Sequence, residues 1–290
     1  MKLKVKLVQI RFQENFTQLW VPVSPVSRTT TPNRPQLQLH CRWQPSETSD
    51  RNSVPLELRK VLEAMKDKSQ TSPHRNFLKC LHEYNICRYT EHDADEVFHT
   101  ILGLIQEQTD QQTAAEIRNL YKINLEVCTE CLHCQNVHRV PNIFLSLPLH
   151  LHEDTNTLYY KLLSLPSILC INLKRFRNIH GFTRKLNSKV SFLETINVAE
   201  MLPEEHPRTT ESRYRLYAVV VHAGMATMGH YTAYIYSTDD KWYYIDDSHM
   251  HQVSWQEVQS TYEGRGRFSE TAYMLLYRTL SSETAQKSAL

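Results

Sequence analysis

The chain has 290 residues, of which 41% are hydrophobic and 22% charged, and its formal net charge is +2 at pH 7. This length suffices for one large domain or two small ones with a sizeable core. The charge gives no indication of nucleic-acid binding, and no apolar run approaches the ~18 residues of a membrane-spanning helix. The six glycines are too few for long glycine-rich phosphate loops.

The first 53 residues differ from the remainder. Residues 1–60 hold ten Lys or Arg against four Asp or Glu, whereas residues 61–290 hold 23 against 27. A short β-like run, Leu3–Ile10, leads into a stretch rich in Pro, Ser, Thr and Arg that cannot bury much apolar surface. We expect residues 1–53 to form a variable or disordered basic arm.

The N-terminus and the cysteines together indicate a compartment. The first residues alternate Lys with apolar side chains and lack the continuous apolar core of a secretory signal. The seven cysteines are an odd number. We therefore expect an intracellular protein, cytoplasmic or nuclear, whose thiols stay free or bind metal.

Apolar residues at helical spacing begin at Val54. Leu58, Val61 and Leu62 recur near the 3.6-residue period. Three further helices are predicted, over Phe77–Tyr84, from Asp93 to Ile105 and over Thr113–Leu120. The helix after Asp93 has acidic residues in its first turn, which suit the positive end of the helix dipole.

From Lys122 the sequence becomes β-rich, with alternation over Ile123–Val127 and a partner run over Val137–Leu149. Between these runs lie Cys128 and Cys131, and a C-x-x-C pair at a turn is half of a tetrahedral zinc site. The side chains that could complete such a site are Cys134, His133, His138, His150 and His152. The alternative is a free thiol pair.

The remaining segments are predicted as loops, strands and one short helix. Asn178–Pro207 has a mixed pattern, with a short strand around Val190–Phe192. A capping box, Ser-x-x-Glu, starts a helix over Ser254–Tyr262. The apolar run Thr271–Tyr277 is typical of a buried strand, and Cys170 lies in a similar run, where a small core residue is expected.

A strand-loop-strand-turn-strand pattern occupies residues 218–253. Gly224 and Gly229 bracket a flexible loop, after which His230 opens one strand, and Asp246 and Asp247 close the next. An antiparallel hairpin would place these ends side by side, so that a carboxylate accepts the second N–H of the imidazole. This is the base and orienter of a nucleophilic triad. The alternative is a surface histidine beside two solvated acids.

Three blocks of sequence resemble the ubiquitin-specific proteases, a family of papain-like cysteine proteases. Residues 91–97 are similar to the family signature Gln-x-Asp-Ala-x-Glu-Phe. Residues 165–176 resemble its Leu-Pro-x-x-Leu-x-x-x-Leu-x-Arg-Phe strand, and residues 214–248 resemble its histidine box. The Glu-His-Asp-Ala-Asp block and the Val-Ser-Trp-Gln-Glu-Val-Gln-x-Thr-Tyr ending are most similar to the member that removes the interferon-induced ubiquitin-like modifier.

The resemblance implies an α+β, papain-like ubiquitin-specific protease fold in incomplete form. Its parts are a helical thumb over 54–120, shortened fingers over 121–176 and a palm with the histidine box over 177–280, followed by a polar tail over 281–290. By the same resemblance His230 is the general base and Asp246 its orienter, while Asp247 is a second acid that could substitute or assist around the oxyanion. The family shares one zinc between two C-x-x-C pairs, and here the second pair is missing.

The nucleophile is not recognisable. In the family, the cysteine opens a helix after a Gly-Leu-x-Asn-x-Gly-x-Thr-Cys run, where N–H groups lower the thiol pKa and help to form the oxyanion hole. Residues 1–90 contain Cys41, Cys80 and Cys87, and none has this context. Only Cys41 lies upstream of the part that resembles the family. Losing the nucleophile removes nearly all the catalysis of a triad. We therefore expect this chain to be inactive as written, with no nucleophile assigned.

Two functions follow from the resemblance. The first is thiol-dependent hydrolysis of isopeptide bonds after the C-terminal Gly-Gly of ubiquitin or a ubiquitin-like modifier, through an acyl-thioester and without a catalytic cofactor. The second is a catalytically inactive protein that binds the modifier or acts as a scaffold. In both, the expected partners are ubiquitin or a ubiquitin-like modifier and its conjugates, with no nucleic acid and no membrane.

Overall fold

The computed structural model describes residues 53–64, 74–86, 92–131, 133–151, 157–198, 213–237, 239–246, 249–264 and 270–280. The chain divides into two compact units, one formed by residues 1–118 and 228–258 and the other by residues 119–227 and 259–290. The expected basic arm over 1–53 lies outside the described residues except for Ser53, and so does the tail over 281–290. None of the described helices is both long enough and apolar enough to cross a membrane.

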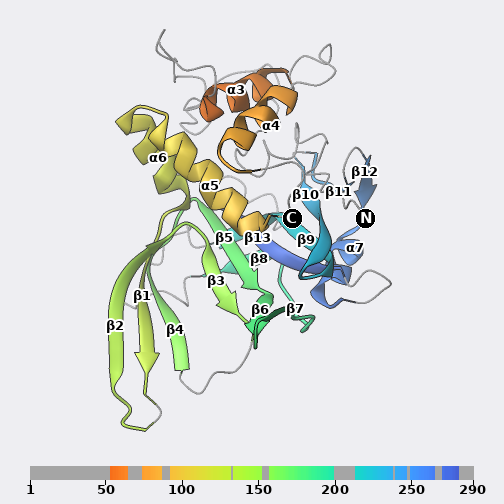
Figure 1. Cartoon of the computed structure of the whole chain (residues 1–290). Coiled ribbons are helices and arrows are strands. Elements are labelled where there is room, and N and C mark those ends of the chain that lie inside the picture. The colour runs from red at the N-terminus through yellow and green to blue at the C-terminus, as the bar shows by residue number, and fades with distance from the viewer. Residues whose placement is uncertain are drawn as a thin grey trace. The chain divides into compact units, whose positions relative to one another are not determined.

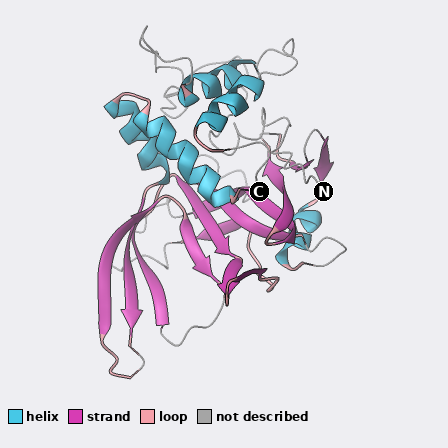
Figure 2. Cartoon of the chain, in the orientation of Figure 1, coloured by secondary structure: helices cyan, strands magenta, loops and turns pink. Residues whose placement is uncertain are grey.

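Four helices open the described part of the chain (Figure 2). They are α3 (Val54–Ala64), α4 (His74–Glu83), α5 (Ala94–Glu107) and α6 (Gln111–Tyr121). The apolar face of α5 is buried, with Phe98, Ile101, Leu102 and Ile105 at helical spacing. The backbone N–H of Val54 donates to Oε1 of Gln108 at 2.8 Å, which ties the start of α3 to the end of α5.

Three strands of the first unit form an antiparallel meander. These are β10 (Met228–Tyr236), β11 (Trp242–Asp246) and β12 (His249–Val253), in which Tyr236 pairs with Trp242 and Trp242 with Val253. The meander leads into α7 (Trp255–Gln259) and a 3₁₀ turn, η3 (Ser260–Tyr262). The predicted capping box is confirmed, because Ser254 N–H donates to Glu257 Oε2 at 2.8 Å and Glu257 N–H donates to Ser254 Oγ at 3.3 Å.

The second unit contains a sheet with the order β9-β13-β5-β3, and β8 pairs with β9. The strands are β9 (Arg213–Met225), β13 (Thr271–Thr279), β5 (Ile168–Lys174), β3 (Leu147–His150) and β8 (Thr195–Asn197). All neighbours are antiparallel except β3 and β5. Seven successive residues of β13, Thr271 to Tyr277, are buried, so this strand lies in the core of the unit.

A second, three-stranded sheet has the order β2-β1-β4. It is formed by β1 (Ile123–Glu130), β2 (Val137–Phe144) and β4 (Thr157–Ser164), and the hairpin β6–β7 (Phe176–Ile179 and Phe182–Lys185) stands separately. Figure 1 shows β1, β2 and β4 running side by side, with the β1–β2 turn at the free end of the sheet. This sheet corresponds in sequence to the fingers expected from the family.

Three expectations about elements require correction. No strand forms at Val190–Phe192, because the Val190 N–H donates to the Tyr262 carbonyl at 2.8 Å and the Phe192 ring packs on that of Tyr262. The loop expected between the two glycines is mostly strand, since β9 runs to Met225 and β10 starts at Met228. The run over 137–149 is two strands, β2 and β3, in different sheets.

Candidate active site

His230 and Asp246 come together at one end of the β10–β11 hairpin. The two strands are antiparallel and Ala233 pairs with Ile245, so the start of β10 lies beside the end of β11. Nε2 of His230 lies 2.6 Å from Oδ1 of Asp246. The side chains are 39% and 40% exposed, so the imidazole is accessible to a reacting group.

This geometry defines which ring nitrogen can act. An ionised carboxylate only accepts hydrogen bonds, so Asp246 holds the proton of the neutral imidazole on Nε2. Nδ1 then carries the lone pair and is the nitrogen able to take a proton from an attacking group. Asp246 also stabilises the imidazolium that results. The arrangement is that of a general base with its orienting acid.

The hairpin that carries the pair is fixed at its opposite end. The Ser237 N–H donates to the Lys241 carbonyl at 2.8 Å, and Asp240 adopts a left-handed conformation with φ of 61°. The Tyr243 hydroxyl donates to Oδ2 of Asp239 at 2.7 Å, and this bond lowers the pKa of the Asp239 carboxyl below its usual value. These contacts set the register between the two strands, and through it the approach of His230 to Asp246.

Aromatic pairs pack along the same hairpin. The ring centroids of Tyr234 and Tyr244 lie 5.0 Å apart, and those of Tyr236 and Trp242 lie 5.4 Å apart. Trp242 also packs on Trp255 of α7 at 5.5 Å. Cross-strand aromatic pairs stabilise an antiparallel sheet, so the site is built on a rigid element.

The remaining predicted site acid, Asp247, lies outside the described residues.

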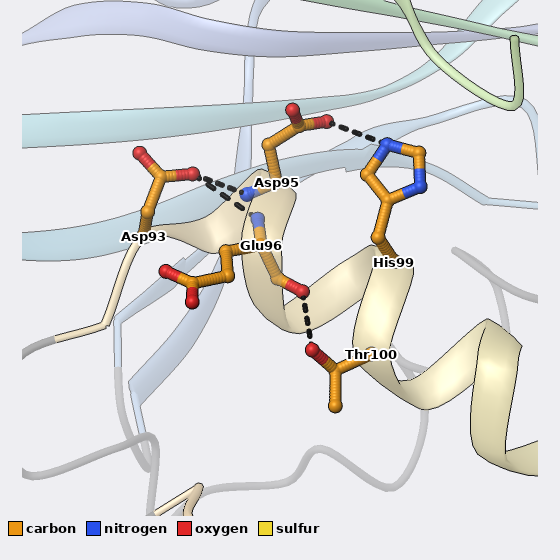
Figure 3. Close-up of polar contacts among 5 residues, drawn as sticks. All are labelled: Asp93, Asp95, Glu96, His99 and Thr100. Carbon is orange, nitrogen blue, oxygen red and sulfur yellow. Dashed lines mark hydrogen bonds and ion pairs between the residues drawn. The ribbon is translucent and has the colours of Figure 1, made fainter.

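The described part of the signature-like block, residues 92–97, leads into and begins α5 (Figure 3). Oδ1 of Asp93 accepts from the backbone N–H groups of Asp95 at 2.9 Å and Glu96 at 3.2 Å, so Asp93 is the N-cap. The side chain of Asp95 is directed toward the ring of His99, with Oδ1 and Nε2 3.6 Å apart. The motif therefore has a defined local role, which is to start α5.

The described cysteines differ in their surroundings. Cys80 is buried in α4, and burial, followed by the charges of Glu57 and Glu83, raises its thiol pKa to about 11. A thiol in this state is protonated at neutral pH and is a weak nucleophile. Cys41 and Cys87 lie outside the described residues. In the part of the chain that is described, the side chain of His230 has Asp246 as its hydrogen-bond partner.

The two cysteines of the C-x-x-C segment, Cys128 and Cys131, differ in their exposure to solvent. Cys128 is fully buried within β1, and its Sγ lies 3.8 Å from the Glu126 carbonyl oxygen. Cys131 instead lies at the β1–β2 turn, just after the end of β1, and is partly exposed. Across the described ranges there is no group of three or more His, Cys, Asp or Glu side chains able to hold a metal ion. Zinc at Cys128 and Cys131 stays a prediction from the sequence.

An accessible imidazole oriented by a carboxylate is the catalytic base of several classes of hydrolase, including the papain-like cysteine proteases. Comparison with known proteins identifies the class. The sequence model of the ubiquitin carboxyl-terminal hydrolase family matches residues 16–277, most of the chain. This protein belongs to that family.

Individual relatives agree with this assignment. Ubl carboxyl-terminal hydrolase 18 of Mus musculus is 31% identical over 277 residues, covering 80% of this chain and 75% of that protein. The Homo sapiens protein of the same name is 29% identical over 272 residues, covering 78% and 73%. The family resemblance seen in the motifs is therefore confirmed.

A solved structure supports the fold. The SAGA DUB module with Ubp8, bound to monoubiquitin, matches with a TM-score of 0.67 at 21% sequence identity. The match covers 84% of this chain and 62% of that chain. The α+β ubiquitin-specific protease fold expected from the sequence is confirmed, whereas the internal boundaries drawn for thumb, fingers and palm stay predictions.

Proposed function

We propose that this chain engages the C-terminal tail of ubiquitin or a ubiquitin-like modifier, with His230 and Asp246 as the base and orienter of thiol-dependent isopeptide hydrolysis. The observation that carries the proposal is the 2.6 Å contact between His230 Nε2 and Asp246 Oδ1 at the end of a rigid hairpin. The names of the Mus musculus and Homo sapiens relatives, which specify Ubl hydrolases, support a ubiquitin-like modifier as the partner.

In this reaction a thiolate attacks the carbonyl carbon of the modifier's terminal glycine. Nδ1 of His230 takes the proton of the thiol and gives it to the departing amine, and water then hydrolyses the acyl-thioester in a second step. Asp246 keeps the imidazole in the tautomer that can receive the proton. Asp247, next to Asp246 in sequence, is proposed as a second acid of the same site.

A second function, binding without cleavage, is favoured by the cysteines. Cys80 is buried in α4, and its pKa is raised to about 11. Neither Cys41 nor Cys87 has the sequence context of the family nucleophile. The alternative proposal is therefore that the chain binds the modifier and does not cut its conjugates.

Labelling with ubiquitin and with the interferon-induced modifier, each carrying a C-terminal thiol-reactive warhead, tests the two functions together. Binding of the unmodified modifiers is measured in parallel by calorimetry, with a scrambled-tail modifier as the control. Binding without labelling supports the second function. Labelling that is lost in both Cys41→Ala and His230→Ala supports the first and identifies the nucleophile. A folded chain that neither binds nor labels would contradict both.

A further inference from the structure

The β6–β7 hairpin, which Figure 1 shows beyond the end of β5, has a tip that its own residues fix. Its strands pair along their whole length and leave a two-residue loop, His180-Gly181. Both loop residues have positive φ, 51° at His180 and 83° at Gly181, as in the tight turns whose twist matches that of a hairpin. Oδ1 of Asn178 accepts from the Gly181 N–H at 2.9 Å. The hairpin is therefore a preformed element.

One face of this hairpin packs against its own unit. Phe176 and Lys185 are cross-strand partners and so belong to the same face. The ring of Phe176 packs on that of Tyr273 with centroids 5.2 Å apart, and Nζ of Lys185 donates to the His222 carbonyl at 2.7 Å. Because successive residues of a strand alternate between the two faces, the next pair along the hairpin belongs to the opposite, outer face.

The outer face carries two arginines and a phenylalanine. Arg177 is the direct cross-strand partner of Arg184, and Phe182 lies on the same face because it precedes Arg184 by two residues in β7. Both arginines are exposed, and Phe182 is 76% exposed, more than any other large apolar side chain among the described residues. Arginine and aromatic side chains are the types enriched where proteins bind one another.

The stability of the hairpin does not explain the arginine pair. Like charges directly opposite each other destabilise an antiparallel pair of strands. Residues 176–185 hold three Lys or Arg and no Asp or Glu. Among the residues that the structure describes, no carboxylate forms an ion pair with Arg177 or Arg184. The guanidinium donors of both side chains are therefore available to an anionic partner.

The size and the surroundings of this face favour one kind of anion. Guanidinium groups bind carboxylates through two parallel hydrogen bonds each. A nucleic acid requires a longer series of phosphate contacts, and it would meet an acidic body, because residues 61–290 hold 23 Lys or Arg against 27 Asp or Glu. A short acidic peptide segment that also carries an apolar side chain fits two arginines beside an exposed phenylalanine.

We propose that the outer face of the β6–β7 hairpin is a docking surface for an acidic segment of a partner protein. Carboxylates of this segment bind Arg177 and Arg184, and a neighbouring apolar side chain of the segment packs on Phe182. Because the hairpin is preformed, docking costs it little conformational entropy. The small surface makes the interaction weak and transient. It does not depend on cleavage, since none of the three residues belongs to the His230 and Asp246 pair.

Fluorescence anisotropy tests the proposal. The full chain is titrated into a labelled synthetic peptide in which Asp and Glu flank a central Leu, and the control peptide carries Asn and Gln at the same positions. The expected result is saturable binding of the acidic peptide alone, weakening as salt is added. No saturable binding, equal binding of both peptides, or tighter binding of a single-stranded oligonucleotide of the same charge would overturn the proposal. Displacement of the peptide by unconjugated ubiquitin would also overturn it, because the face would then serve modifier recognition.

Variants locate the surface. Replacing both Arg177 and Arg184 by Ala should weaken peptide binding on the order of tenfold or more, because charge-assisted hydrogen bonds are lost. Replacing both by Lys should restore only part of the affinity, since an ammonium group cannot bind a carboxylate through two parallel bonds. Phe182→Ser should also weaken binding, whereas Arg139→Ala, at an exposed arginine of β2, is the matched control and should bind like the original chain. Equal affinities for the double Ala variant and Arg139→Ala, with urea unfolding showing both folded, would overturn the proposal.

Discussion

Lys185 donates a hydrogen bond from Nζ to the carbonyl oxygen of His222 at 2.7 Å, and this contact joins the end of β7 to β9. The ring of His222 packs edge-on against Phe176 of β6, with centroids 4.9 Å apart. The ring of Phe176 also packs on that of Tyr273 of β13, with centroids 5.2 Å apart. The β6–β7 hairpin is therefore held to the sheet of its unit by aromatic contacts of Phe176 and by a hydrogen bond from a lysine. A lysine in such a position makes the stability of the unit depend on pH.

Removing this lysine should change how stability varies with pH. Burial, followed by the neighbouring charge of Arg175 and opposed by Glu270, lowers the pKa of Lys185 to about 8, whereas an unfolded lysine titrates near ~10.4. Between these values the unfolded chain binds more protons, so the contribution of Lys185 to stability rises with pH. The free energy of unfolding of the original chain minus that of Lys185→Met should therefore increase from about pH 7.5 to about pH 9.5.

Urea unfolding at several pH values measures this difference, because other titrating groups contribute equally to both proteins. Lys189→Met is the control, since Lys189 is 58% exposed and pairs with Glu263 at 3.0 Å. It reports the effect of removing one exposed positive charge. A difference for Lys185→Met that falls across the window would contradict the pH dependence expected from its burial.

Arg175 is expected to be among the most sensitive positions in the second unit. Its side chain is fully buried, and its guanidinium donates to the backbone carbonyls of Ala272 at 2.6 Å, Leu186 at 2.8 Å and Ser188 at 2.9 Å. Arg175→Met leaves three carbonyls without this donor, and each buried polar group left unsatisfied costs about 1–3 kcal/mol. We expect a loss of about 3 kcal/mol or more in the free energy of unfolding.

Arg177, two residues further along and exposed on β6, provides the matched control. Arg177→Met should change the free energy of unfolding by less than about 0.5 kcal/mol. Equal losses for the two variants, measured by denaturant unfolding, would show that the network of carbonyl contacts does not stabilise the fold.

Asp246→Asn should allow the neutral ring of His230 to adopt either tautomer. The carboxylate of Asp246 only accepts hydrogen bonds and so keeps the proton on Nε2, whereas an amide can also donate. The ring ¹⁵N shifts of the neutral imidazole should report Nε2–H in the original chain and a mixture of tautomers in the variant. Any thiol-dependent cleavage by the chain should fall by about 100-fold or more.

Asp239→Asn controls for the loss of a carboxylate from the same hairpin, since Asp239 binds Tyr243 at the turn. It should leave the His230 shifts unchanged. Identical ¹⁵N spectra for Asp246→Asn and the original chain would mean that Asp246 does not set the tautomer.

Much of the site was predictable because its determinants are local. Turn residues between two aromatic strands predict a hairpin, and antiparallel pairing of its strands places the end that carries His230 beside the end that carries Asp246. Likewise the helical period predicted α5, with acidic residues in its first turn. These inferences needed only sequence neighbours, and the structure confirms them.

Other features depend on partners far along the chain. The run Val190–Phe192 has strand-forming residues, yet its backbone binds Tyr262, and the Tyr262 hydroxyl donates to the Phe192 carbonyl. The spacing of Cys128 and Cys131 resembles a metal pair, but the register of β1 buries Cys128 and leaves Cys131 at the turn. The register of β1 decides which of its side chains are buried, and local sequence does not specify it.

The N-cap of α5 provides a last test, at the block that resembles a family signature. Because Asp93 accepts from two backbone N–H groups of the first turn, Asp93→Ala should lower the free energy of unfolding by about 1 kcal/mol. Asp93→Asn keeps a capping oxygen and should cost only a few tenths of a kcal/mol, of the order expected for the lost charge at the helix N-terminus. Denaturant unfolding and hydrogen exchange of residues 94–100 measure both. A similar loss in the two variants would show that charge, and not the cap, starts this helix.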